Sequence, residues 1–91
     1  MATAYVTLGP VETRDVFNGK AARSETITTS GTAASGAIIA AVGDIAQVFC
    51  VTAVYARSGS PATGATSVFC PGGVPTFIRM TSGDVVSLID A

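Results

Sequence analysis

The sequence predicts an all-β fold: a small antiparallel β-sandwich or barrel of about six short strands, with an extended N-terminal arm. The 91 residues suffice for one small domain. Runs rich in β-branched and aromatic residues recur at roughly ten-residue spacing, which is typical of small all-β domains. Gly, Pro, Ser and Asp residues, which favour turns, separate these runs, and no segment demands a helix.

Residues 1–24 are expected to form the arm and residues 25–91 the sandwich domain. The arm is rich in charged residues, contains turn signals at residues 9–10 and 18–19, and has apolar residues without a clean period. Those apolar side chains need burial, either on the domain's own core or on a neighbouring subunit. The candidate subunit-contact residues are Tyr5, Leu8, Val11, Arg14 and Phe17 in the arm, and Arg79 in the domain.

The domain reads as short strand-like segments in a regular order. Arg79 alternates with Ile78 and Met80, so its side chain should point outward, into solvent or towards an acidic group of a partner. The segments are residues 25–29, a short apolar stretch at 37–42, a core strand at 45–56, and residues 67–70, 76–80 and 85–89. The turns between them lie at residues 43–44, 57–66, 71–75 and 82–84.

The core strand at residues 45–56 has apolar side chains on both faces. Its β-branched and aromatic content favours a strand over a helix. Apolar residues on both faces predict burial on both sides, inside the domain or under a subunit contact. One face would carry Ile45, Phe49, Val51 and Tyr55, and the other Val48, Cys50 and Val54.

The two cysteines, Cys50 and Cys70, leave three interpretations open. They can be buried thiols that pack as small apolar residues. If the intervening chain forms a hairpin centred near Ser60, they would face each other and a disulfide could form. A reactive thiol is least favoured, because no base or cation lies nearby in the sequence.

No pattern for catalysis, metal binding or cofactor binding is present. The chain contains no histidine, which removes the imidazole base and His ligands, and two cysteines fall short of a tetrahedral zinc site. Asp44 and Asp84 each follow a glycine before a strand, which is typical of structural turns. We therefore expect a protein that is not an enzyme, with no catalytic residues, no metal and no cofactor.

The charge content points to protein partners. Five scattered Lys and Arg residues argue against nucleic-acid binding, and the longest apolar stretch is too short for a membrane span. The N-terminal residues show no pattern of a signal peptide. Charged residues make up 12% of the chain, against about 25% in an ordinary domain, so copies repel one another weakly. We expect a homo-oligomer, with a trimer favoured.

Residues 69–75 (FCPGGVP), Phe77, residues 81–84 (TSGD) and residues 87–89 (SLI) follow a Thr-, Ser-, Gly- and Ala-rich middle. In this the chain resembles small β-rich virion proteins of tailed bacteriophages. The resemblance implies a virion location and a structural role, decorating or cementing a capsid or forming the base of a head fibre, with the major capsid protein or other virion proteins as partners. The alternative is a tail or fibre component, or an adhesin-like module, that binds through the loop at residues 57–66.

Overall fold

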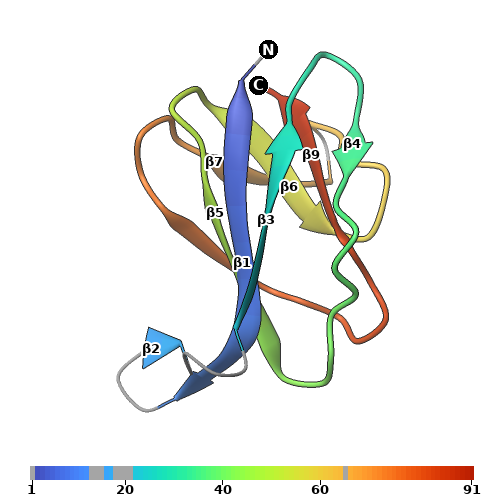
Figure 1. The fold of residues 1–91 in the computed structure, drawn as a ribbon. Helices are drawn as coiled ribbons and strands as arrows, with labels where there is room; N and C mark the ends of the chain where they lie inside the picture. Colours follow the sequence, from blue (N-terminus) through green and yellow to red (C-terminus); the bar gives the residue numbers. More distant parts are fainter. Residues whose placement is uncertain (1, 13–15, 18–21, 65) are drawn as a thin grey trace.

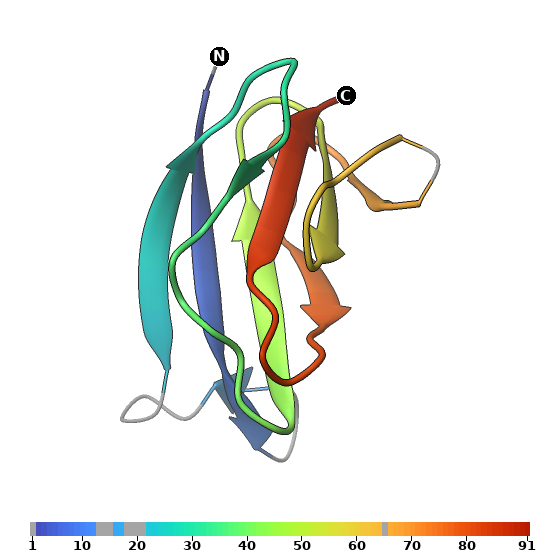
Figure 2. The ribbon, with the colours of Figure 1, turned by 90° about the vertical axis from the view of Figure 1, so that its right-hand side faces the viewer.

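The computed structural model describes residues 2–12, 16–17, 22–64 and 66–91. Over these ranges the chain is all-β, and two antiparallel sheets pack as a small β-sandwich (Figure 1, Figure 2). None of the described residues forms a helix that could cross a membrane. The strands are β1 (Thr3–Glu12), β2 (Val16–Phe17), β3 (Arg23–Thr28), β4 (Ala34–Ser35), β5 (Asp44–Phe49), β6 (Val54–Ser58), β7 (Val68–Cys70), β8 (Thr76–Arg79) and β9 (Val86–Asp90).

The two sheets exchange strands along the chain. The first sheet has the order β3-β1-β5-β8, and β2 pairs with the end of β1. The second sheet has the order β4-β9-β6-β7. The described ends of the chain, in β1 and β9, lie at the same end of the sandwich (Figure 1, Figure 2). Four expected strands, at residues 25–29, 67–70, 76–80 and 85–89, are confirmed as β3, β7, β8 and β9 with small shifts of their ends.

The core lies between the sheets and follows the two-residue alternation of the strands. In β5 the side chains of Asp44, Ala46 and Val48 are buried, and those between them are half-buried. The second sheet contributes alternate residues of β6 and consecutive buried residues of β9. The fully buried apolar residues are Ala4, Val6, Leu8, Ala46, Val48, Val54, Ala56, Val86 and Leu88, each 0% exposed.

The expectation of an N-terminal arm is wrong for the described part of residues 1–24. β1 lies between β3 and β5, with Tyr5 opposite Thr26 on one flank and Phe49 on the other. Gly9 lies within this strand and not in a turn. A Cβ at this position would be 2.9 Å from the Cα of Ala22, so glycine permits the close approach of the two backbones. The boundary at residue 24 therefore does not divide an arm from a domain.

The expected core strand at residues 45–56 is two strands that belong to different sheets. β5 ends at Phe49, residues 50–53 turn, and β6 begins at Val54 in the second sheet. The buried residues Val48, Cys50 and Val54 all belong to one of the two expected faces, and they line the core between the sheets. The outer face of β5 is half-buried and Val51 in the turn is 70% exposed, so the domain itself does not bury both faces of this stretch.

The apolar stretch at residues 37–42 is not a strand either. Its amides pair with carboxylates: Glu25 Oε1 accepts from Ala37 N at 2.7 Å, Glu25 Oε2 from Ile38 N at 3.2 Å, and Asp44 Oδ2 from Ala41 N at 2.9 Å. Ala40 N donates to the Asp84 carbonyl at 2.8 Å. These hydrogen bonds replace those of a β-ladder, and through them the segment contacts both β3 of the first sheet and the turn before β9.

Candidate interaction surface

The carboxylates that could carry chemistry hold the backbone and neighbouring side chains in place. Asp44 is 2% exposed, accepts from Ala41 N, and forms an ion pair with Arg23. Asp84 Oδ2 accepts from the Ser58 hydroxyl at 3.0 Å. Among the described residues no group of three or more His, Cys, Asp or Glu could hold a metal ion. These carboxylates thus accept hydrogen bonds that stabilise turns and loops, as expected for Asp residues that follow a glycine.

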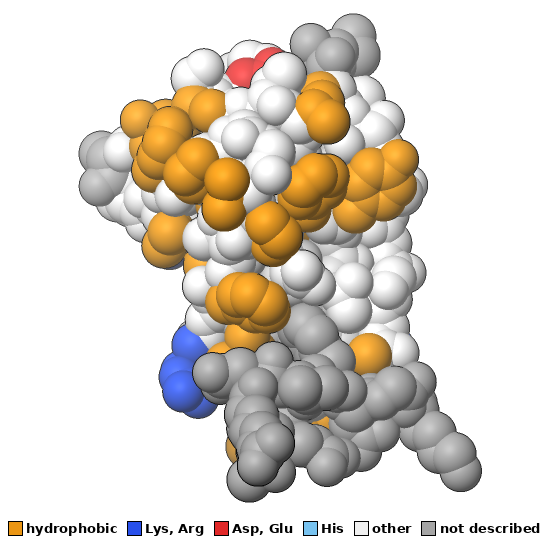
Figure 3. All heavy atoms as spheres, turned by 90° about the vertical axis from the view of Figure 1, so that its left-hand side faces the viewer, with side chains coloured by type: hydrophobic (Ala, Val, Ile, Leu, Met, Phe, Trp, Pro, Cys, Tyr) orange, Lys and Arg blue, Asp and Glu red, His pale blue; other side chains and the backbone are white. Residues whose placement is uncertain are grey.

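The distinctive feature of the surface is an apolar band on one side of the sandwich. Figure 3 shows hydrophobic side chains gathered across this side, with the charged side chains that it shows lying at its margins. The band combines aromatic residues from the outer face of the first sheet with residues of β7 and of two adjoining turns. We define it as Tyr5, Phe49, Val51, Val68, Phe69, Val74 and Phe77.

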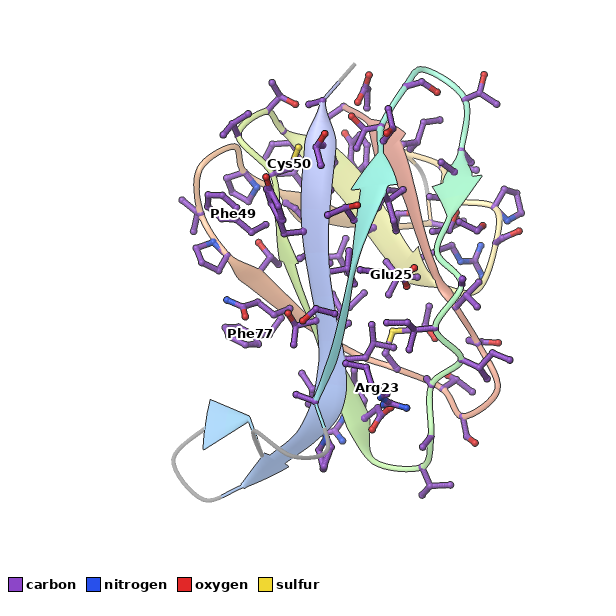
Figure 4. All side chains as sticks on the ribbon, in the orientation of Figure 1. Arg23, Glu25, Phe49, Cys50 and Phe77 are labelled. Atoms are coloured by element: carbon purple, nitrogen blue, oxygen red, sulfur yellow. The ribbon has the colours of Figure 1, made fainter. Side chains whose placement is uncertain are left out.

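Strand register brings together the three aromatic residues of the first sheet, which are Tyr5, Phe49 and Phe77. Tyr5 of β1 lies directly opposite Phe49 of β5, and Phe77 of β8 lies opposite Gln47, one step along the same face. Diagonal neighbours of this kind are within reach of aromatic side chains. Phe49 and Phe77 lie on the same side of the ribbon in Figure 4. Tyr5 is 57% exposed and Phe77 52%, which is high for aromatic residues.

The other half of the band lies where two turns pack together. Gly73 N donates to the Cys50 carbonyl at 2.8 Å, which ties the β7–β8 turn to the β5–β6 turn. Gly72 is required there, because a Cβ would lie 2.6 Å from the carbonyl oxygen of Val51. The rings of Phe69 and Tyr55 pack edge to face, with centroids 5.6 Å apart and planes at 65°. These contacts hold the exposed faces of Phe69, Val51 and Val74 in fixed positions.

The structure separates the subunit-contact candidates into three groups. Tyr5 and Arg79 are exposed, as expected, and Tyr5 belongs to the band. Leu8 was expected at a contact, but it is 0% exposed in the core, because it shares the inward face of β1 with Ala4 and Val6. Arg14 lies outside the described residues, as do the side chains of Val11 and Phe17.

Sequence reasoning missed Phe69 and Phe77 as surface residues. The signal for Phe77 was present: Ile78 and Met80 alternate with Phe77 and Arg79, and burial of one pair exposes the other. For Phe69 no such signal exists. β7 has three residues, and two of them, Val68 and Phe69, are exposed in succession, which breaks the alternation.

The loop at residues 57–66 is less open than expected. Arg57 and Ser58 belong to β6, and Ala62 is 1% exposed, with its amide bonded to the Ser87 hydroxyl at 3.0 Å. A Cβ on Gly64 would lie 3.5 Å from the ring of Tyr55, the aromatic residue next to this loop. Gly64 and Phe69 therefore both lie beside this ring, which is half-buried.

Both cysteines are buried free thiols. Cys70 lies opposite Val54 in the β6–β7 pair, so the hairpin that would place it opposite Cys50 is not formed. Burial raises the pKa of Cys70, and a hydrogen bond with the Thr76 side chain partly opposes this effect. The structure agrees with thiols that pack as apolar residues.

We expect the intact mass of the chain to be the same under non-reducing and reducing conditions. Because both thiols are buried, a thiol reagent should modify the native chain slowly and the urea-unfolded chain fast. Mass spectrometry before and after alkylation measures both effects. A non-reduced mass lower by two hydrogens would show a disulfide and contradict the free-thiol structure.

Comparison of this chain with protein-family models, with curated proteins and with solved structures found no match.

Proposed function

We propose that this chain is a non-enzymatic structural protein of a virion that decorates or cements a phage capsid and works by packing against neighbouring proteins. The observation that carries the proposal is the apolar band. Its members come from four strands and turns that are rigidly joined, and it carries no charged side chain. A contiguous apolar patch of this kind on a small protein marks a protein interaction site.

The composition supports the same role. A net charge of −1 with 12% charged residues leaves little repulsion between copies or with neutral neighbours. Many copies on a lattice would add weak contacts into strong attachment. The capsid and the partner proteins enter through the resemblance of residues 69–89 to small virion proteins, which makes the major capsid protein or other virion proteins the proposed neighbours.

Particles produced without the chain test the proposal. Purified chain, added back, should sediment with such particles and raise the temperature at which they release their DNA. Phe77→Asp should weaken this binding about tenfold or more, because it places a charge in the band. Val42→Asp is the matched control, since Val42 is an 86% exposed apolar residue that precedes the start of β5, whereas Phe49 of the band ends that strand.

Two results would overturn this function. The added chain could stay in the supernatant at every concentration, or Phe77→Asp and Val42→Asp could bind equally well. In the second case the chain would attach to the particle by a surface other than the band.

A further inference from the structure

The two sides of the sandwich at which the edge strands lie differ in how they are covered. On the β3–β4 side, residues 36–41 run from one sheet to the other (Figure 2), and Glu25 holds the backbone of this connection with both carboxylate oxygens. Gly36 N donates to the Val86 carbonyl and Gly83 N to the Ala40 carbonyl, which completes the closure. On the opposite side, β7 and β8 end their sheets, and in the described part of the chain each has a strand partner on one flank only.

In the described part of the chain, the three residues of β7 carry neither a charge nor a proline that would protect this sheet edge. Natural edges are commonly blocked by charged side chains, by a proline within the strand, or by a covering segment. Val68, Phe69 and Cys70 include no charge and no proline, and Val68 and Phe69 are 47% and 50% exposed. Pro71 follows at once, so a strand added at this edge cannot extend its pairing beyond Cys70 in that direction.

The size of the band is that of a protein interface. Tyr5, Phe69 and Phe77 are between 50% and 57% exposed, so at about 200 Å² for an aromatic side chain they present about 300 Å². The exposed valines raise the apolar total to about 500 Å², near the upper end for the largest patch on a monomer. With a polar rim, the band approaches the about 800 Å² that each partner buries in a specific complex.

We propose that the occupant of this side is a second copy of the chain, related by a two-fold axis, with the two β7 strands paired antiparallel at Phe69. A partner for the β7 end of the band must itself be apolar and uncharged there, and the β7 edge of a second copy meets both conditions. A two-fold contact uses the same patch on both copies, so Phe69 lies opposite its equivalent. The pair would join two four-stranded sheets edge to edge. This inference rests on the proposed function and divides the band between two partners. The second copy takes the β7 end with Phe69, and the aromatic residues on the outer face of the first sheet, including Phe77, stay available to the particle.

The edge geometry favours this pair over the trimer that composition alone favours. Antiparallel pairing of β7 with itself about Phe69 is a two-fold operation, and three copies cannot share it. The shortness of β7 also limits growth, because the edge is used up when one copy has bound, and the short β4 ends the other side of the second sheet.

Sedimentation of the purified chain over a wide concentration range tests the pairing. The wild-type chain and Val42→Asp should form dimers. Phe69→Asp should stay folded by circular dichroism, and the dissociation constant of its dimer should be about tenfold higher or more. In a second experiment, Phe69→Cys should form a disulfide-linked dimer on mild oxidation, because residues opposite each other in an antiparallel pair lie within about 6 Å. Val42→Cys should not.

The outcomes separate this inference from the proposed function. A monomer at every concentration, a trimer, or equal cross-linking of Phe69→Cys and Val42→Cys would overturn the two-fold pair. If such a chain still binds particles through the band, the proposed function stands without it. A dimer that Phe69→Asp dissociates, in a chain that never binds particles, would support the pair and overturn the capsid role.

Discussion

Leu8→Ala should lower the free energy of unfolding by about 3 kcal/mol, within the range of about 2–5 kcal/mol for deleting a buried leucine side chain. Leu8 is 0% exposed and is among the largest fully buried residues. It lies in β1, which has a strand partner on both flanks, so the backbone cannot easily collapse into the cavity. Urea unfolding, followed by circular dichroism, measures the change as a lower midpoint.

Tyr5→Ala is the matched control on the same strand. Tyr5 faces outward and is 57% exposed, so its loss should cost less than about 1 kcal/mol, mainly the cross-strand pair with Phe49. The two variants should separate stability from assembly: Leu8→Ala weakens folding, and Tyr5→Ala weakens association. Equal effects on unfolding would mean that β1 does not alternate between core and surface as the structure shows.

Asp44→Ala should lower the free energy of unfolding by about 2–3 kcal/mol, because it leaves buried polar groups without their acceptor. Asp44 accepts from Ala41 N at 2.9 Å and from Arg23, and it is 2% exposed. The Arg23 side chain is 39% exposed, so water recovers part of its lost interaction, which keeps the cost below that of a fully buried pair. Denaturant unfolding measures the loss.

A double-mutant cycle with Arg23→Gln divides this cost. The ion pair is the coupled part, and the amide of Ala41 is the part that remains when Arg23 is already replaced. Asp44→Asn, which keeps one acceptor oxygen, should cost less than Asp44→Ala. A change within about 0.5 kcal/mol of wild type for Asp44→Ala would show that the carboxylate does not hold this loop.

The sequence predicted the fold class and most strands of the second half of the chain, since these follow from local residue preferences. The β-branched run at residues 25–29 and the glycine-containing turns around β8 and β9 each act within a few neighbours. The errors arose where a long-range contact decided the outcome. Gly9 marks a close approach of Ala22, and the partners of residues 37–42 are carboxylates many positions away or across a turn.

The sequence predicted that the chain has an exposed apolar surface, but not which residues form most of it. Low charge and surplus apolar residues predicted a contact surface, and the candidate Tyr5 is exposed in the structure and belongs to the band. Leu8 was assigned to it wrongly, because a single apolar residue carries no information about its face until the strand is paired. Phe69 depends on which strand ends a sheet, and strand order is a property of the whole fold.

Hydroxyl-radical footprinting of the chain in the assembled particle and of the dilute free chain tests most directly whether the apolar band is a protein interface. We predict that Tyr5, Phe69 and Phe77, all at least half exposed in the free fold, are oxidised several-fold more slowly in the particle. Val42, the most exposed large apolar residue in the described part of the chain, serves as the internal reference. Equal oxidation of the three aromatic residues in both states, or protection confined to Val42, would contradict the account.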